Sequence, residues 1–235
     1  MNVRSFETLF QTGAREGPVR DVMRFHLIYS GPLSASGNKS KIDEAAKIRA
    51  ALSSQIEQLW KKHHALSVLL KEAAIPPQNV GVTILMRPQG LMRPREVALQ
   101  GGLGFQDLLI AFDVGTRQFL PLVRSSLHLN CEIDILFLRQ QDPGALISQG
   151  GDIDNRVKTL LDALRMPSGD EEARAPSPGA GLLYCLMESD TLVSRLNIDT
   201  DRLLFAESEK PNEVHLVIEI SLNVLQVQPY NQCLL

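Results

Sequence analysis

The segment LHLNCEIDILFLR, residues 127–139, is followed after a polar loop by NRVKTLLDAL, residues 155–164. In the first segment Ile133, Ile135 and Phe137 face one way, which predicts a strand with one buried side. In the second segment Val157, Leu160, Leu161 and Leu164 lie on one helical stripe, which is typical of an amphipathic helix. The two segments together predict a strand that leads into a helix packed on the sheet.

The rest of the chain adds further elements. Three other segments alternate between apolar and polar residues and predict strands: residues 24–31, 191–199 and 213–227. From Asp43 to about Leu70 the apolar residues recur at helical spacing, so we expect a long helix there. Residues 80–86 fit a strand, whereas residues 105–124 fit a strand or a helix equally well.

The element order predicts a single α+β (mixed α/β) domain in which helices pack on a sheet. Residues 1–23 are polar and are expected to form an N-terminal arm, and residues 24–235 the domain. Two stretches, about 75–125 and 167–185, contain many prolines and glycines, and we interpret both as insertions. Within the second stretch, residues 167–181 are expected to be a charged linker.

Composition narrows the class of protein. The 235 residues are 44% hydrophobic and contain no run of 18 apolar residues, so we expect no membrane span. The N-terminus lacks the pattern of a secretory signal, and the three cysteines show no CxxC spacing, so the expected location is the cytoplasm. A net charge of −3 argues mildly against a protein that coats nucleic acid, but it does not exclude a nuclease.

An acidic cluster occurs where the loop meets the helix. Asp152 and Asp154 lie two residues apart, and a helix N-terminus favours negative charge. Lys158 follows Asp154 by four residues and therefore shares its helix face, about 6 Å along the axis. Asp162 is four residues further on. The same residues also fit an ordinary helix cap and a surface ion pair, so this pattern alone leaves both interpretations open.

The segment GDIDNRVKTLLDAL, residues 151–164, resembles the signature of RusA-type Holliday-junction resolvases. In that signature Asp-x-Asp-Asn is followed by a lysine and then by Asp-Ala-Leu. The matching residues are Asp152, Asp154, Asn155, Lys158 and 162–164. In MESDTLVSRL, Asp190 takes the place of the family's third metal-binding aspartate.

The resemblance extends upstream of this signature. FHLIYSGPLSASGNKSK, residues 25–41, is similar to the family's opening strand and its Pro-x-Ser-x-Asn-type loop, with Asn38 in the place of the asparagine. The similarity covers about residues 24–62 and 131–224. One stretch departs from the family pattern: residues 140–151, QQDPGALISQGG, contain no basic residue, although the family has arginines and lysines there.

The resemblance implies a Mg²⁺- or Mn²⁺-dependent endonuclease acting on DNA, including four-way junctions, as a homodimer. It places the metal on Asp152, Asp154 and Asp190, whose oxygen atoms suit either ion. Lys158 is implied as a catalytic residue beside the scissile phosphate. Asn38, in the place of the family's asparagine, is a candidate nucleic-acid contact. The basic residues on or after the first loop and in the first insertion fit phosphate contacts and a solvated polar face equally well; they are Lys39, Lys41, Lys47, Arg49, Arg87, Arg93 and Arg95.

Two alternatives remain open. The chain fits a non-catalytic RusA-like module that binds nucleic acid or protein, and the missing basic residues favour this alternative. It also fits a nuclease for RNA or single strands, which shares the site and differs in substrate. The complete set of Asp152, Asp154, Lys158 and Asp190 favours an enzyme.

Overall fold

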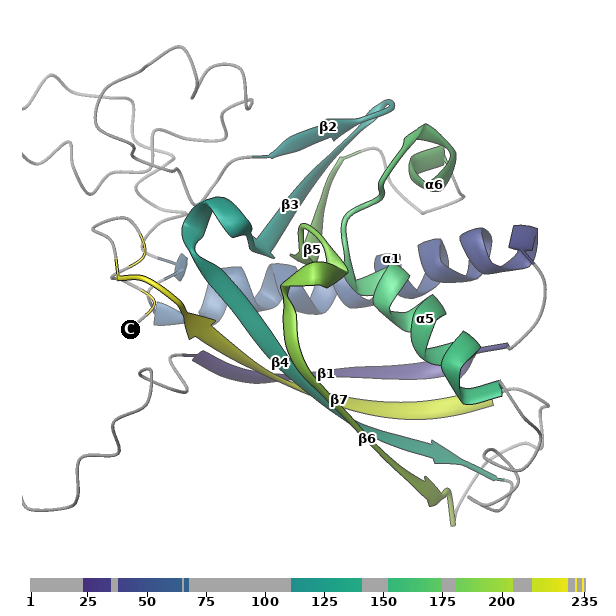
Figure 1. Cartoon of the computed structure of the whole chain (residues 1–235). Coiled ribbons are helices and arrows are strands. Elements are labelled where there is room, and N and C mark those ends of the chain that lie inside the picture. The colour runs from purple at the N-terminus through teal and green to yellow at the C-terminus, as the bar shows by residue number, and fades with distance from the viewer. Residues whose placement is uncertain are drawn as a thin grey trace, which may run out of the picture.

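The computed structural model of the chain contains two β-sheets and three α-helices within the part that it describes (Figure 1). That part comprises residues 23–34, 38–64, 66–67, 111–140, 152–174, 181–204, 213–227, 231 and 234. Helices and strands are interleaved along the chain, and each sheet combines parallel with antiparallel pairs. The predicted α+β fold class is therefore confirmed.

The larger sheet has four strands. Their spatial order is β1 (Met23–Pro32), β7 (Glu213–Val224), β4 (Leu129–Arg139) and β6 (Val193–Arg202). Strand β7 runs antiparallel to both β1 and β4, whereas β4 and β6 run parallel. The alternating sequence patterns predict all four strands, and the structure confirms them with small shifts at their ends.

The smaller sheet has three strands in the order β2 (Phe112–Val114), β3 (Arg117–Val123) and β5 (Leu182–Met187). A two-residue turn joins β2 to β3, and Gly115 adopts a left-handed φ of +59° there, which glycine tolerates without strain. Strand β5 lies parallel to β3. The ambiguous segment 105–124 thus forms strands in its described part.

Three α-helices accompany the sheets: α1 (Asn38–Lys62), α5 (Asp152–Leu164) and the short α6 (Asp170–Arg174). Two short 3-10 helices, η2 (Ser125–Leu127) and η3 (Asp190–Leu192), precede β4 and β6. Helix α1 begins five residues before the expected start at Asp43. Helix α6 lies in the stretch that is expected to be a linker.

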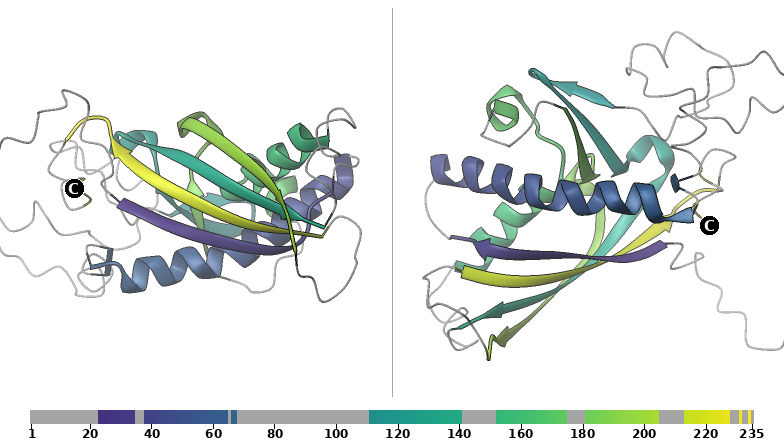
Figure 2. Two further views of the ribbon diagram at one scale, coloured as in Figure 1. Left: turned by 90° about the horizontal axis from the view of Figure 1, so that it is seen from below. Right: turned by 180° about the vertical axis from the view of Figure 1, so that it is seen from behind.

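The long helix α1 crosses the molecule between the two sheets, next to β1, β5 and α5 (Figure 2). One cluster of buried apolar side chains joins these elements to both sheets. Its largest members include Trp60 on α1, Leu120 on β3 and Phe137 on β4, each at most 1% exposed. Leu120 belongs to the first stretch interpreted as an insertion, so the described part of that stretch contributes to the core.

Several expectations fall outside the described residues. They concern the arm before Met23, the strand at 80–86 and the loop at 141–151. None of the helices that the structure describes is long and apolar enough to cross a membrane.

Replacing Phe137 by alanine tests whether β4 forms the centre of the core. Phe137 is 1% exposed, so Phe137→Ala is expected to lower the free energy of unfolding by about 3–5 kcal/mol. Its neighbour Leu136 points to the opposite face and is 39% exposed, so Leu136→Ala is the matched control, with an expected loss of about 1 kcal/mol or less. Urea unfolding measures both, and equal losses would contradict the assigned faces of β4.

Candidate functional site

The acidic motif lies at the start of α5, as the sequence predicts. The helix begins at Asp152, whose side chain lies outside the described set. The side chains of Asp154 and Lys158 are both exposed to solvent. Because these two residues are four apart on one helix, they lie on the same side of α5, one above the other. That side of α5 presents one carboxylate and one ammonium group to solvent.

The buried side of α5 differs in part from the predicted stripe. The stripe is predicted at Val157, Leu160, Leu161 and Leu164, whereas the most buried residues are Arg156, Thr159, Leu160, Ala163 and Leu164. The reason is that α5 lies chiefly against α1, with a smaller contact to β5, rather than on the larger sheet. Arg156 is 4% exposed and donates a hydrogen bond to the backbone carbonyl of Leu33.

The loop that resembles the family's Pro-x-Ser-x-Asn segment is described only at its start, where Leu33 and Ser34 contact both helices. The hydroxyl and the backbone N–H of Ser34 donate to the carboxylate of Glu44 on α1, at 2.7 and 2.9 Å. The carbonyl of the preceding residue, Leu33, accepts from Arg156 on α5. Leu33 and Ser34, the described start of this loop, are therefore held between the first turns of α1 and α5.

One predicted nucleic-acid contact meets the acidic motif directly. Lys41 donates from Nζ to Oδ1 of Asn155 over 3.0 Å, although the two residues are 114 positions apart in the chain. The side chains of Asn38 and Lys39 lie outside the described set, but their backbone forms the first turn of α1. The start of α1 is thus adjacent to the first turns of α5.

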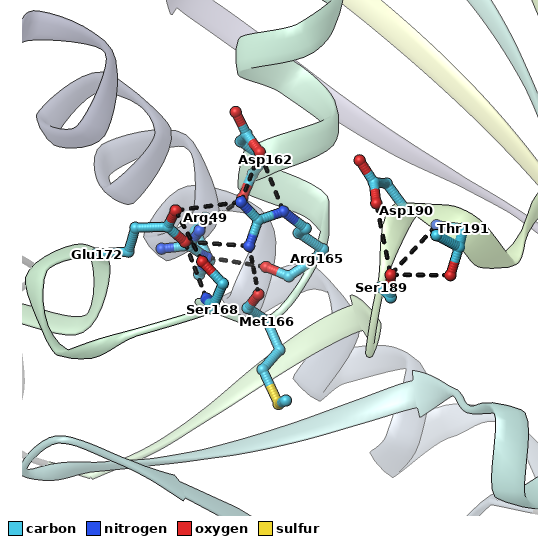
Figure 3. A network of polar contacts seen from close by, with 9 residues as sticks. All are labelled: Arg49, Asp162, Arg165, Met166, Ser168, Glu172, Ser189, Asp190 and Thr191. Carbon is cyan, nitrogen blue, oxygen red and sulfur yellow. Dashed lines mark hydrogen bonds and ion pairs between the residues drawn. The ribbon is translucent and has the colours of Figure 1, made fainter. Parts of the chain in front are cut away.

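Asp190 lies in a third part of the chain that packs next to the same helix. It is exposed and begins η3, which packs against α5. The hydroxyl of Ser189 donates to Asp190 Oδ1 over 3.4 Å and accepts from the backbone N–H of Thr191. Figure 3 shows Asp190 on the element beside the C-terminal part of α5, where Met166 N–H donates to the carbonyl of Met187.

The three predicted metal ligands therefore all lie on or next to α5. The structure does not show their carboxylates converging on one point. Asp154 lies eight residues before Asp162, about 12 Å along the axis, whereas Asp190 lies near the Asp162 end. Among the described side chains, no group of three or more His, Cys, Asp and Glu residues is positioned to hold a metal ion. A complete set of carboxylates at this site depends on Asp152.

The available donors nevertheless suit a hard divalent cation. Asp154 and Asp190 are exposed carboxylates, and carboxylate oxygens are the ligands that Mg²⁺ and Mn²⁺ prefer. Cys131 and Cys185 are buried, and burial raises the pKa of each thiol to about 12. Both cysteines therefore pack as small apolar residues.

Asp162 belongs to a polar network at the end of α5 (Figure 3). Arg165 donates to Asp162 Oδ1 at 2.7 and 3.0 Å and to both oxygens of Glu172 on α6 at 3.0 and 3.2 Å. Glu172 also accepts from the backbone N–H and the hydroxyl of Ser168. These hydrogen bonds tie α6 to the end of α5, so Asp162 has a structural role in holding the two helices together.

Arg49 on α1 contacts the C-terminal end of α5. It is 4% exposed and donates to the backbone carbonyls of Asp162 and Arg165, at 2.5 and 3.1 Å. From the sequence, Arg49 is a candidate for phosphate contact or for a solvated polar face, and the structure supports neither role. Lys47, from the same set, is exposed, whereas the candidates Arg87, Arg93 and Arg95 lie outside the described residues.

Sequence reasoning misses the two buried arginines that hold α5. Arg156 lies within the signature itself, but a charged residue next to exposed Asn155 gives no sign of burial in the sequence. Arg49 occurs in a helix with many charged residues, where one buried guanidinium cannot be distinguished from its exposed neighbours. The acceptors of both side chains are backbone carbonyls distant in the chain, and these become neighbours only on folding.

Comparisons with protein-family models, with curated proteins and with solved structures gave no match.

The ion pair between Arg165 and Glu172 predicts a pH-dependent contribution to stability. Burial by itself would raise the pKa of Glu172, but hydrogen bonds from Arg165 and Ser168 outweigh it, so the pKa lies below the ordinary 4.5. A lowered carboxyl pKa in the folded state stabilises the fold above pH 4.5, and this stabilisation is lost as the pH falls through the lowered value. Glu172→Gln should therefore reduce stability at pH 7, and the deficit should shrink below pH 4.5.

Urea unfolding between pH 3 and 7 measures this difference. Glu171→Gln is the matched control, because Glu171 is the exposed neighbour on the same helix. A deficit that is constant across this pH range would show that Glu172 does not act through its charge.

Proposed function

We propose that the chain is a divalent-metal-dependent endonuclease, similar to RusA-type resolvases, that hydrolyses phosphodiester bonds in branched or structured DNA. One observation carries the proposal: three distant segments of the family-like pattern meet at α5. The start of α1 is joined to α5 through Lys41 and Asn155, and η3 with Asp190 packs on the same helix.

The resemblance gives Asp152, Asp154 and Asp190 as metal ligands, but Asp190 lies near the Asp162 end of α5. The proposal therefore places Mg²⁺ or Mn²⁺ on Asp152 and Asp154, which would hold it together with water molecules. Such an ion supplies Lewis acidity, which makes water a better nucleophile and stabilises negative charge on the leaving oxygen. In the hydrolysis the oxygen of water bonds to phosphorus and the phosphorus–oxygen bond to the leaving 3′-oxygen breaks, with the proton passing to solvent.

The remaining side chains orient the phosphate. Lys158 is exposed on the Asp154 side of α5, so its ammonium group is free to donate to a phosphate oxygen and to stabilise the charge that develops there. Asn155 accepts from Lys41 and thereby keeps a second ammonium group beside the first turns of α5. Lys41, Lys39 and Asn38 contact the nucleic-acid backbone near the scissile bond.

A non-catalytic RusA-like interaction module is the second candidate. The absence of basic residues from 140–151 favours it, since phosphate contacts supply most of the affinity for DNA. The role of Asp162 in the Arg165 network also fits a purely structural α5. Action on RNA or single strands remains part of the wider proposal, and the same substrates test it. A cytoplasmic location is also part of the proposal.

Cleavage assays separate the two candidates. The substrates are a labelled four-way junction, flap, duplex, single-stranded DNA and RNA, each with Mg²⁺, Mn²⁺ or EDTA. Asp154→Asn removes the charge of a proposed ligand at an exposed position and is expected to abolish cleavage without loss of fold. Lys158→Ala is expected to slow the chemical step by about 10²–10³, as is typical when one donor to the transition state is lost.

The control for these variants is Glu171→Gln, which removes an exposed carboxylate on α6. It should leave the rate unchanged. If wild-type protein cleaves none of the substrates even with Mn²⁺, the non-catalytic candidate is correct. If cleavage survives Asp154→Asn, the activity comes from another site or from a contaminant.

The contribution of Lys41 to binding is testable separately from cleavage. Lys41→Ala should weaken junction binding and reduce the slope of log Kd against log salt by about 1, because one phosphate contact is lost. Lys62→Ala, at the opposite end of α1, is the matched control. Fluorescence anisotropy in EDTA measures both, and an unchanged salt slope for Lys41→Ala would mean that Lys41 only stabilises α5.

A further inference from the structure

Three consecutive residues at the end of β1, 32–34, are each bound by a different element. The carbonyl of Pro32 accepts from the hydroxyl of Tyr29, on the same strand, over 2.8 Å. Leu33 is 0% exposed, and its carbonyl accepts from Arg156 on α5. The third residue is bound by α1. The position of this segment is therefore fixed relative to β1, α5 and α1.

Glu44 makes the contact from α1. Its carboxylate accepts from the hydroxyl of Ser34 over 2.7 Å and from the N–H of Ser34 over 2.9 Å. Hydrogen bonds to an ionised carboxylate are stronger than those between neutral groups. Burial, and after it the charge of Glu44, raise the pKa of Tyr29 to about 12, so the Tyr29 hydroxyl keeps its proton at neutral pH. Glu44 therefore supports the segment both directly and through Tyr29.

These contacts close a ring between the first turns of α1 and α5, and Figure 1 shows both helices starting at the same end of the molecule. Lys41 donates from Nζ to Oδ1 of Asn155 over 3.0 Å. Asn155 precedes Arg156, which leads back through residues 33–34 to Glu44. Glu44 and Lys41 are three apart on α1 and are therefore neighbours on its surface. Without the Glu44 contact, Lys41 loses one of the two paths that place it beside α5.

The charge of Glu44 is unfavourable for DNA binding at this position. A carboxylate beside Lys41 lowers the affinity for DNA, because contacts between cations and phosphates supply most of that affinity. Asp43, the preceding residue on α1, carries the same charge and is exposed. Glu44 is half-buried and accepts two hydrogen bonds from Ser34. The two acids thus allow the effect of charge to be separated from the effect of position.

We propose that Glu44 is a positioning residue for nucleic-acid binding. Through Ser34 it holds the first turns of α1 against α5, so that Lys41 stays where it contacts a phosphate of the bound DNA. The proposal rests on the proposed function, since that function gives Lys41 a phosphate to contact. Glu44 itself touches neither the nucleic acid nor the metal. Its presence increases the affinity for a polyanion, which is the reverse of the direct effect of its charge.

Binding measurements in EDTA test this role. Fluorescence anisotropy, over a range of salt concentrations, uses the nucleic acid of the panel above that wild-type protein binds most tightly. Glu44→Ala is expected to weaken binding several-fold and to reduce the slope of log Kd against log salt by about 1, because the Lys41 contact is lost with it. Asp43→Ala is the matched control, which removes the same charge from the adjacent position. It should bind as tightly as wild-type protein or more tightly.

A double variant distinguishes positioning from a general loss of stability. If Glu44 acts through Lys41, the double variant Lys41→Ala/Glu44→Ala loses no more affinity than Lys41→Ala alone, because the effects of coupled residues are not additive. Ser34→Ala removes one of the two donors and should weaken binding in the same direction. Circular dichroism during heating checks that each variant is folded.

Additive losses in the double variant, or equal affinities of Glu44→Ala and Asp43→Ala, would overturn the role of Glu44 and leave the proposed function standing. Wild-type protein that binds no nucleic acid of the panel would overturn the proposed function, and the role of Glu44 with it.

Discussion

Helix α5 is attached to the rest of the protein by two buried arginine side chains. Arg156 donates to the carbonyl of Leu33 near the start of the helix, and Arg49 donates to the carbonyls of Asp162 and Arg165 at its end. A buried guanidinium is costly unless it is hydrogen-bonded, so both arginines require these acceptors in place. These hydrogen bonds fix the position of α5 along α1. They therefore also fix the positions of the segments that contact α5.

The arrangement of charge along α5 follows from this attachment. The helix has aspartates at its start and arginine donors at its end, which is the polarity that a helix dipole favours. Because the arginines and the apolar residues occupy the buried side, Asp154 and Lys158 are left facing solvent on a rigid support. A site built on a fixed helix keeps its geometry better than one built on a loop, which suits the proposed positioning of a phosphate.

Helix α1 contributes both to the candidate site and to the cover of one edge of the larger sheet. Its first turns approach α5 through Lys41, and its middle supplies Arg49. Gln55 further along covers the β1 edge, where its amide accepts from the N–H of Ile28 and donates to the carbonyl of Ile28. One helix therefore holds the proposed site and closes one side of the larger sheet. The other side has no comparable cover in the described part of the chain, so the asymmetry of the sheet is a consequence of where α1 packs.

The sequence by itself determined the α+β class, the four strands of the larger sheet and the helix at 155–164, because periodic apolar residues report directly on burial in each element. It also identified Asp154 and Lys158 as residues of one helix face. Only the tertiary structure decided that α5 packs on α1, that Arg49 and Arg156 are buried, and that residues 112–123 form strands of a second sheet. The second sheet depends on the pairing of β3 with β5, about 64 residues further on in the chain. The packing of α5 depends on contacts between segments more than a hundred residues apart, such as Lys41 with Asn155 and Arg49 with Asp162, and no local pattern records which distant groups will satisfy a buried charge.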